Sequence, residues 1–403
     1  MNAKPHDPAA ARRILFWMCV IIGVNQLGFG AVIPVLPLYA KSFGVSVSAI
    51  GMTVAVYGFA RFAAALPGAG MCDRIGRRPA LAIGGAASVL GNLWSGLAGD
   101  FDGFLLARLL AGAGAGLVMT AGSVVIADIS PPERRGRTMA TYMGVFLFAV
   151  GVGPWPGGLL AEHFGLEAPF HFYAVLSVVV GAVAWWLIPE TRDLEGHGHV
   201  SGGPPRATFF GQLGTLARNP GYMLVCLIGF TNAFVRTGAL FSVVPLLASE
   251  SLGLNPGQIG GAFALGSVLG MLASYPAGAI ADRHGRKPVI VPATLMTGVS
   301  FVAYWLAPSF AWFLVASIIW GIAAAVSGAA PSAYAADSAP PGTNATAMAG
   351  YRMLSDVGYV VGPISLGLLA DLAGSATTLV VAAVTIVLVG ALFARYAPES
   401  HRR

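Results

Sequence analysis

The stretch that decides the fold is DRIGRR at Asp73–Arg78, because much the same string returns as DRHGRK at Asp282–Lys287, 209 positions later. Each string is short and polar, and long apolar stretches lie on both sides of it. Other pairs keep the same shift without a gap: Asp128 with Asp337, Gly153-Pro154 with Gly362-Pro363, and Pro189-Glu190 with Pro398-Glu399. This register predicts a duplicated unit, so we expect two parallel halves that form a site between them.

The composition indicates a membrane protein. Hydrophobic residues make up 56% of the 403 residues and charged residues 10%, whereas a soluble domain is about a quarter charged. Apolar segments of roughly 20 residues recur, and each is long enough to cross about 30 Å of hydrocarbon as a helix. They lack the alternation of a transmembrane β-barrel. We therefore predict an all-α polytopic membrane protein with twelve transmembrane helices in two pseudo-symmetric six-helix bundles.

The hydrophobic pattern sets the expected boundaries. The twelve spans are expected at residues 14–39, 48–70, 79–98, 103–127, 138–161, 170–188, 221–248, 258–280, 288–306, 309–335, 346–371 and 374–396. We expect an N-terminal six-helix half at 1–190, a cytoplasmic linker at 191–220 and a C-terminal six-helix half at 221–403. The first segment is too long for a signal peptide and lacks a small-residue cleavage site, so we expect it to be retained.

The positions of the charges say more than the net charge of +6. One alternate set of loops carries Arg12, Arg13, Arg74, Arg77, Arg78, Arg134, Arg135, Arg137, Arg218, Arg283, Arg286 and Lys287. The other set carries Lys41 with Asp100, Asp102, Glu162, Glu167 and Glu250. The positive-inside rule therefore predicts a cytoplasmic (inner) membrane protein with both termini cytoplasmic, and no nucleic-acid partner. The three cysteines imply no disulfide framework.

Segments 69–78 and 278–287 resemble the loop between helices 2 and 3 of the major facilitator superfamily, and the resemblance covers essentially the whole chain. The first copy has Ala69 where the family usually has Gly, whereas the second copy keeps Gly278. This resemblance implies the major facilitator fold and transport by alternating access between two half-domains.

The two loops predict a pair of ionic contacts. Arg77 carries a fork of donors that needs a carboxylate, and Asp128 at the end of helix 4 is the candidate partner. The repeat offers the same pair again as Arg286 and Asp337. Asp73 and Asp282 end helices, where an acid can accept hydrogen bonds from another helix's N-terminus. The resemblance implies that Asp73, Arg77, Asp128, Asp282, Arg286 and Asp337 form a cytoplasmic latch that stabilises the outward-facing state. Charges that only enforce topology are the alternative.

Helices 1 and 5 narrow the function. Helix 1 contains LGFGAVIPVLP (27–37) and helix 5 contains GVGPWPGG (151–158). Kinks and close helix contacts are expected at Pro34, Pro37, Gly153, Pro154, Gly157 and Gly158. Both elements resemble signatures of the twelve-span drug:proton antiporters, although Ala149 stands where the helix 5 element usually has Gly. They favour export over uptake, while the alternative is that Gly and Pro are common in any membrane helix.

Ionisable residues inside the bilayer are costly, so they are functional candidates. The spans contain Arg61, Arg108, Arg236, Arg352 and Asp356. We assign proton coupling to Asp356, Arg352, Arg61 and Arg108. Asp356 is the one deeply placed acid, and Arg352 precedes it by one helical turn. The resemblance places Arg61 near Asp356 and Arg108 in a helix 4 element, in which Ala111 replaces the customary Gln. A permanent structural ion pair remains the alternative.

Polar residues near the middle of two equivalent helices indicate a substrate cavity. These are Asn25 and Gln26 in helix 1, and Asn232 and Arg236 in helix 7. Helix 1 carries no acid, unlike that of several multidrug antiporters. With four intramembrane arginines against one aspartate, a neutral or anionic amphiphile is favoured over a strong cation.

These features predict a multidrug-resistance type of efflux transporter, which exports a small organic molecule by proton antiport and acts as a monomer in the lipid bilayer. A sugar or metabolite symporter or facilitator is the alternative, and a membrane sensor that lost transport is a further one. An enzyme is least favoured, since no nucleophile elbow, His-rich metal motif or Walker loop occurs. The GHGH at 196–199 is interpreted as a solvated loop. We expect no cofactor and no metal.

Overall fold

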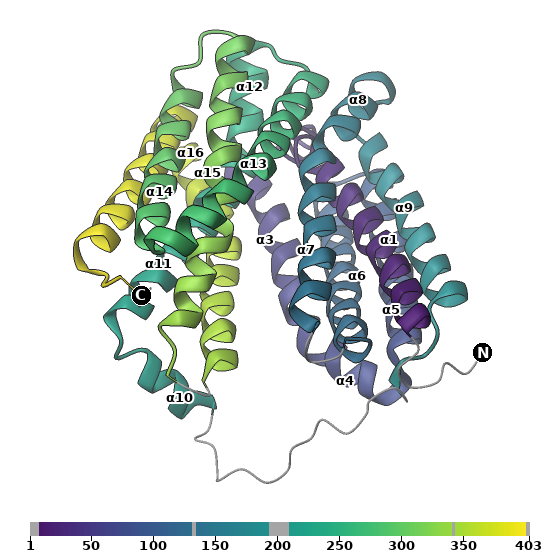
Figure 1. Cartoon of the computed structure of the whole chain (residues 1–403). Coiled ribbons are helices and arrows are strands. Elements are labelled where there is room, and N and C mark those ends of the chain that lie inside the picture. Colours follow the sequence, from purple (N-terminus) through teal and green to yellow (C-terminus); the bar gives the residue numbers. More distant parts are fainter. Residues whose placement is uncertain (1–7, 131–133, 193–208, 341–342, 400–403) are drawn as a thin grey trace. The chain divides into compact units, whose positions relative to one another are not determined.

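The computed structural model describes residues 8–130, 134–192, 209–340 and 343–399, which form helices without any strand among them (Figure 1). The helices of the first part are α1 (Pro8–Val32), α2 (Leu36–Lys41), α3 (Val47–Ala63), α4 (Ala65–Ile75), α5 (Arg77–Leu97), α6 (Phe101–Asp128), α7 (Arg135–Val152), α8 (Pro154–Phe164) and α9 (Ala168–Leu187). Those of the second part are α10 (Phe209–Leu216), α11 (Pro220–Val235), η2 (Arg236–Val243), α12 (Val244–Leu252), α13 (Pro256–His284), α14 (Lys287–Trp305), α15 (Phe310–Asp337) and α16 (Asn344–Tyr396).

The helices are those of a multi-span membrane protein. Ten helical stretches in the described residues are long and apolar enough to cross a membrane, and the pair α3 and α4, bent by 43°, gives an eleventh. The 53-residue α16 is far longer than one crossing requires. Gly374, with φ of 83°, divides it into two helices and so gives the twelfth span. The predicted all-α fold with twelve spans is confirmed.

The chain packs as two compact units. The first contains Met1–Phe43 and Val56–Gly202, and the second contains Gly44–Ala55 and Gly203–Arg403. One cut, between Gly202 and Gly203, falls inside the segment 191–220 that the sequence predicts as a linker, whereas residues 44–55 of the expected N-terminal half fall in the second unit. The beginning of α3 belongs to the second unit and the rest of α3 to the first, so this one helix is shared.

The first unit has an apolar core between its long helices. Within it α1 packs on α7 and α9, while α5 packs on α6 and α9. Met18 and Ile21 on α1, Val118 and Val125 on α6, and Val180 on α9 are buried together. The core therefore lies where the helices meet, while many apolar side chains such as Trp186 and Leu97 remain exposed, as expected for lipid-facing surfaces.

The second unit repeats this arrangement. Here α11 packs on α16, α13 on α15, and α14 on both α15 and α16. The short helix α10 lies against the start of α16, because Leu216 is buried and Thr346 Oγ1 donates to Gln212 Oε1 at 2.6 Å. The end of the predicted linker is thus fixed to the second unit.

Two helix breaks lie at prolines. The chain leaves helical geometry between α1 and α2 at residues 33–35, where Pro34 offers no N–H and its ring clashes with the carbonyl four residues earlier. The fifth span breaks between α7 and α8 at Gly153, and Pro154 begins the next helix. Pro37 lies in the first turn of α2, where a missing N–H costs nothing.

The seventh span contains a π-helix, η2, which follows α11 directly. Ser242 Oγ donates to the carbonyl of Thr237, five residues earlier, at 2.9 Å. Pro245 comes just after η2 and cannot donate to the carbonyl four residues before it, which favours a wider turn at this point. π-Helical turns of this kind occur frequently at functional sites.

Candidate functional site

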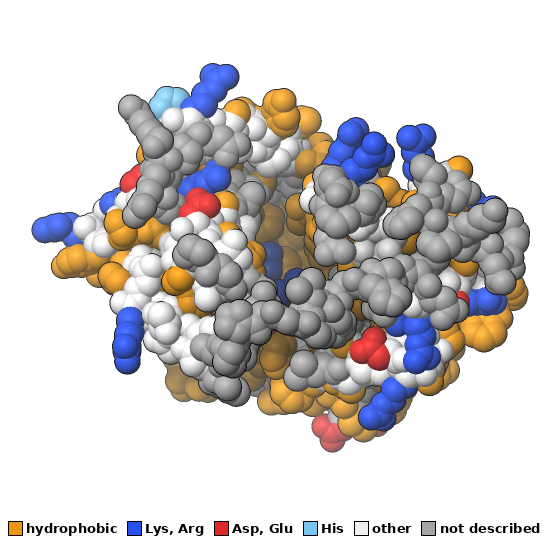
Figure 2. All heavy atoms as spheres, turned by 60° about the horizontal axis from the view of Figure 1, so that its bottom comes forward, with side chains coloured by type: hydrophobic (Ala, Val, Ile, Leu, Met, Phe, Trp, Pro, Cys, Tyr) orange, Lys and Arg blue, Asp and Glu red, His pale blue; other side chains and the backbone are white. Residues whose placement is uncertain are grey.

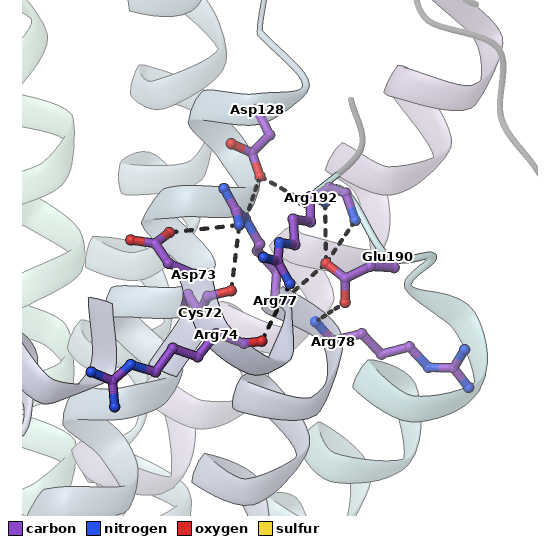
Figure 3. A network of polar contacts seen from close by, with 9 residues as sticks. Cys72, Asp73, Arg74, Arg77, Arg78, Asp128, Glu190 and Arg192 are labelled. Atoms are coloured by element: carbon purple, nitrogen blue, oxygen red, sulfur yellow. Dashed lines mark hydrogen bonds and ion pairs between the residues drawn. The ribbon is translucent and has the colours of Figure 1, made fainter. Parts of the chain in front are cut away.

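A buried ionic cluster lies where α4 turns into α5 (Figure 3). Arg77 Nε donates to Asp128 Oδ2 at 3.0 Å, and the two side chains are 1% and 6% exposed. Arg77 Nη1 also donates to the carbonyl of Cys72 at 3.3 Å. Asp73 lies 3.7 Å from Arg77 Nη1 but is 73% exposed. The predicted partners Arg77 and Asp128 therefore come together, with Asp73 at the rim of the cluster.

Glu190 completes this cluster. Its Oε1 accepts from the backbone N–H of Arg77 at 2.9 Å and its Oε2 from that of Arg78 at 3.2 Å. These groups lie in the first turn of α5, where the helix dipole favours a carboxylate. The next residue, Thr191, donates from Oγ1 to Asp128 Oδ2 at 2.8 Å. Glu190 therefore caps α5, and acceptance by Asp73 from the N-terminus of another helix stays a prediction.

Gly76 makes room for that carboxylate. Its φ is +101°, in the region that favours glycine, and a Cβ added there would overlap the Glu190 side chain. Gly285 in the second copy has φ of +102° and lies in the same way against Glu399. In the sequence analysis, Glu190 and Glu399 are treated only as markers of the repeat. Each follows its Arg-rich string at the same distance, and this spacing could have indicated a role for both in the ionic clusters.

The second unit contains the same cluster in a more open form. Arg286 Nε lies 3.3 Å from Asp337 Oδ2, and the side chains are 18% and 35% exposed. Glu399 accepts from the backbone N–H groups of Arg286 and Lys287 at 2.9 and 3.2 Å. Asp282 ends α13 next to these residues, and its side chain lies outside the described part of the structure. The contact geometry is thus duplicated together with the sequence.

Basic side chains gather near these clusters. In Figure 2, Lys and Arg side chains stand out from the surface, with fewer acidic side chains among them. The exposed arginines of the basic loops include Arg12, Arg13, Arg74, Arg134, Arg137, Arg218 and Arg283.

The fifth span packs closely on the first. A Cβ added to Gly157 would overlap the backbone of Ala31, and one added to Gly153 would overlap the carbonyl of Leu27 and the Cα of Gly30. Gly157 and Gly158 are both buried on α8. The helix break at Gly153-Pro154 therefore brings α8 into backbone contact with the end of α1.

A buried polar cluster lies between α1, α3, α6 and α9 of the first unit. The Arg108 guanidinium lies 4.2 Å above the centre of the Tyr57 ring, and it is almost completely buried. Tyr173 Oη donates to Asn25 Oδ1 at 2.9 Å and lies 3.5 Å from Tyr57 Oη. Asn25 Nδ2 is buried and has no hydrogen-bond partner among the residues that the structure describes. Gln26, next to Asn25, is buried as well.

Two of the residues in this buried polar cluster are functional candidates from the sequence, and two are not. Asn25 and Arg108 were candidates from the sequence, whereas Tyr57 and Tyr173 were not. The signal for the tyrosines was present, because a phenol in the middle of an apolar span needs a hydrogen-bond partner. What the sequence lacked was the helix rotation that directs all four side chains to one place.

In the second unit, Asn232 is half-buried on α11 with an unpartnered Nδ2, and the exposed Arg236 begins η2. Thr237, the next residue, donates from Oγ1 to the carbonyl of Tyr359 at 3.1 Å. That carbonyl lies four residues before Pro363, which has no N–H to offer it. The hydroxyl of Thr237 thus compensates for the proline in α16 and fixes η2 to it.

Asp356 and Arg352 lie one turn apart on α16. Arg352 is exposed and Asp356 half-buried. The expected approach of Arg61 to Asp356 would join the two units and stays a prediction. No group of three or more His, Cys, Asp or Glu side chains in the described ranges could hold a metal ion.

A duplicated bundle of twelve spans with the same charged cluster in each copy defines a multi-span membrane transporter. The family model of the Major Facilitator Superfamily matches residues 18–247 and again residues 225–403. The chain belongs to the major facilitator superfamily.

Curated relatives extend over different parts of the chain. An uncharacterised MFS-type transporter of Methanocaldococcus jannaschii is 23% identical over 378 residues, which cover 93% of this chain and 96% of the relative. Multidrug resistance protein 2 of Bacillus subtilis is 26% identical over 278 residues, or 69% of this chain and 68% of the relative. Quinolone resistance protein NorA of Staphylococcus aureus is 28% identical over 166 residues, or 41% of this chain and 42% of the relative.

Solved structures share the fold. A bacterial homologue of the human lysosomal transporter Spinster has a TM-score of 0.81 at 16% identity, covering 97% of this chain and 98% of that chain. The D-xylose-proton symporter has a TM-score of 0.74 at 16% identity, covering 96% and 98%.

Proposed function

We propose that this protein is an efflux transporter that exports a small organic molecule in exchange for protons by alternating access. The observation that carries the proposal is the close approach of the fifth span to the first. Gly153 lies against the backbone of Leu27, and Gly157 lies against the backbone of Ala31. Small residues allow such a close approach of two helix backbones. The names of two relatives, Multidrug resistance protein 2 and Quinolone resistance protein NorA, support export of drug-like molecules.

The arginine-rich loops support a proposed orientation of the chain in the membrane. Basic residues next to spans remain on the cytoplasmic side. We therefore place both termini and the Asp73–Arg77–Asp128 cluster in the cytoplasm, with the chain in the inner membrane as a monomer. In this orientation the two ionic clusters, one in each unit, act as the cytoplasmic latch.

The buried polar cluster of the first unit supplies substrate contacts. The unpartnered Nδ2 groups of Asn25 and Asn232 are donors for a carbonyl or carboxylate oxygen of a substrate. Gln26 follows Asn25 directly, and Arg236 lies one helical turn after Asn232. Together with Arg61 and Arg108 they favour a neutral or anionic amphiphile. Asp356 carries the proton in this scheme, and Arg352 modulates it.

Proton-coupled uptake is the second candidate, since the D-xylose-proton symporter has the same fold. One experiment separates the candidates: purified protein in proteoliposomes with an imposed pH gradient, tested with a fluorescent quinolone and with D-xylose. Antiport predicts quinolone accumulation against the proton flow, abolished by a protonophore. D-Xylose movement with the protons establishes the symporter. Equilibration of either probe without regard to the gradient indicates a facilitator, and binding without transport indicates a sensor.

A further inference from the structure

The N-terminus of α3 is capped by a residue from the other end of the sequence. The backbone N–H of Val47 donates to Asp371 Oδ1 at 2.7 Å, and that of Ser48 donates to Asp371 Oδ2 at 2.9 Å. The third N–H, of Ala49, donates to Ser46 Oγ at 3.3 Å. Asp371 therefore accepts the first two backbone donors of α3, in the place where a carboxylate is most favourable.

The repeat shows that a distant cap is not a requirement of the fold. Ser46 corresponds to Asn255 under the shift of 209. Asn255 caps its own helix: its side chain accepts from Gln258 N at 2.7 Å, and Gln258 Oε1 accepts from Asn255 N at 3.1 Å. Gln258 corresponds to Ala49, which cannot make that return bond. Ser46 keeps the bond from the third N–H of its helix, as Asn255 does, but the first two N–H groups of α3 are bonded by Asp371 of α16.

Two backbone contacts extend the same interface. A Cβ added to Gly367 would lie 2.8 Å from the Cα of Ser48, and one added to Gly51 would overlap the carbonyl of Pro363. Pro363, Gly367 and Asp371 are four residues apart, so they lie on one face of α16. The first two turns of α3 thus lie directly on this face.

The other part of α3 is fixed elsewhere. A Cβ added to Gly112 or Gly116 of α6 would overlap the backbone of Tyr57 or Arg61. After the bend, α4 leads into the DRIGRR loop and its ionic cluster. The span formed by α3 and α4 is therefore held by carboxylates at both ends: Asp371 at its beginning, and Asp128 through Arg77 just after its end.

We propose that Asp371 is an outer latch, which holds the beginning of α3 on α16 while the transport path is closed to the outside and releases it when the path opens. The inference rests on the proposed alternating-access function. The span formed by α3 and α4 then has two latches: Asp371 at its beginning, and the Arg77–Asp128 pair just after its end. Transport requires that these two contacts open one after the other.

The test uses full-length protein in nanodiscs, without substrate or gradient, so its result is independent of the transport assay. Spin labels at the exposed positions Ser42 and Leu372 report the separation of the two segments, and hydrogen exchange reports the amides of 47–49. In Asp371→Ala both readouts should change: faster exchange at 47–49, and a rise of about fivefold in the ratio of separated to closed populations, as loss of a typical cap produces. Asp371→Asn keeps the size of the side chain and one acceptor oxygen. Its amide exchange and its ratio of separated to closed populations should therefore lie between those of the unchanged protein and Asp371→Ala.

Asp100→Ala is the matched control. Asp100 caps its own helix α6 by accepting from Gly103 N at 2.6 Å, so its loss should affect only local amides. Faster exchange confined to 47–49, with unchanged distances in both Asp371 variants, would make Asp371 a simple cap and overturn the latch. Unchanged exchange would overturn it too. If Asp371→Ala does not fold, the same criteria apply to Asp371→Asn.

Discussion

Arg77 and Asp128 form an ion pair of 3.0 Å in which both side chains are almost fully buried, whereas the equivalent Arg286 and Asp337 are partly exposed at 3.3 Å. Removing one partner of a buried pair leaves an uncompensated charge, while an exposed pair contributes little. The Arg77–Asp128 pair should therefore matter more for the stability of the folded protein than the Arg286–Asp337 pair.

The first prediction follows from this difference. Arg77→Ala should lower the free energy of unfolding by about 3–5 kcal/mol, and Arg286→Ala by about 1 kcal/mol or less. Thermal unfolding of the two variants in the same detergent, followed by tryptophan fluorescence, measures the order. Equal losses in the two variants would contradict the assignment of the buried pair as the stronger one.

The second prediction concerns Glu190 and Gly76. Glu190→Ala removes the acceptor for two backbone donors of α5, so it should cost about 0.5–2 kcal/mol and speed amide exchange at Arg77 and Arg78. Gly76→Ala places a Cβ against the same carboxylate at a positive φ and should be at least as costly. Gly136→Ala is the control, since a Cβ there meets nothing. Normal stability of Gly76→Ala would show that the turn relaxes.

The sequence alone was sufficient for the fold. Hydrophobic length gave the twelve spans, and proline chemistry gave the positions where the first and fifth spans break. It did not give the break between α3 and α4 at Ala64, although Pro67 lies one turn later and cannot donate to the carbonyl of Ala63, the last residue of α3. Nor did it give η2, whose Thr237 hydroxyl donates to the Tyr359 carbonyl of α16, because residue spacing does not show which helix lies beside it.

The candidate site was less accessible from sequence because residue spacing gives a residue's depth in a helix but not its neighbours. Arg77 and Asp128 were paired because complementary charges recur in the repeat. Asp371 was not found, since its partners are backbone N–H groups, which leave no residue signature. Tyr57 and Tyr173 were missed for a related reason: helix rotation decides whether they face Arg108 and Asn25.

The third prediction tests the contact of α8 with α1. Gly157→Ala adds one methyl group where the backbone of Ala31 lies, so the two helices must separate. We expect a folded protein with strongly reduced substrate export. Gly144→Ala is the matched control on the same span, because a Cβ there meets nothing within 4 Å. Normal export by Gly157→Ala in proteoliposomes would remove the main reason for preferring an exporter.

The fourth prediction concerns the buried polar cluster. Tyr173→Phe removes the donor to Asn25 Oδ1 and leaves the ring in place. If Asn25 contacts substrate, the variant should bind it several-fold more weakly, since loss of one hydrogen bond costs about 0.5–1.5 kcal/mol. Ligand-dependent shifts of the melting temperature measure the affinity. Tyr304→Phe, which removes a hydrogen bond to Ser317 in the second unit, is the control and should leave the shift unchanged.

The last prediction is that Asp356 carries the coupling proton. Proton exchange needs a group that loads on one side and releases on the other, and arginine stays charged at any usable pH. A static ion pair with Arg352, which lies one helical turn earlier, is the alternative. We expect Asp356→Asn to fold, to bind substrate, and to exchange it passively in proteoliposomes without acceleration by an imposed pH gradient. Arg352→Gln should retain gradient-driven export, with at most an altered pH dependence. Gradient-driven export by Asp356→Asn would move the carrier to another acid, and loss of folded protein in both variants would instead favour a structural role for this turn of α16.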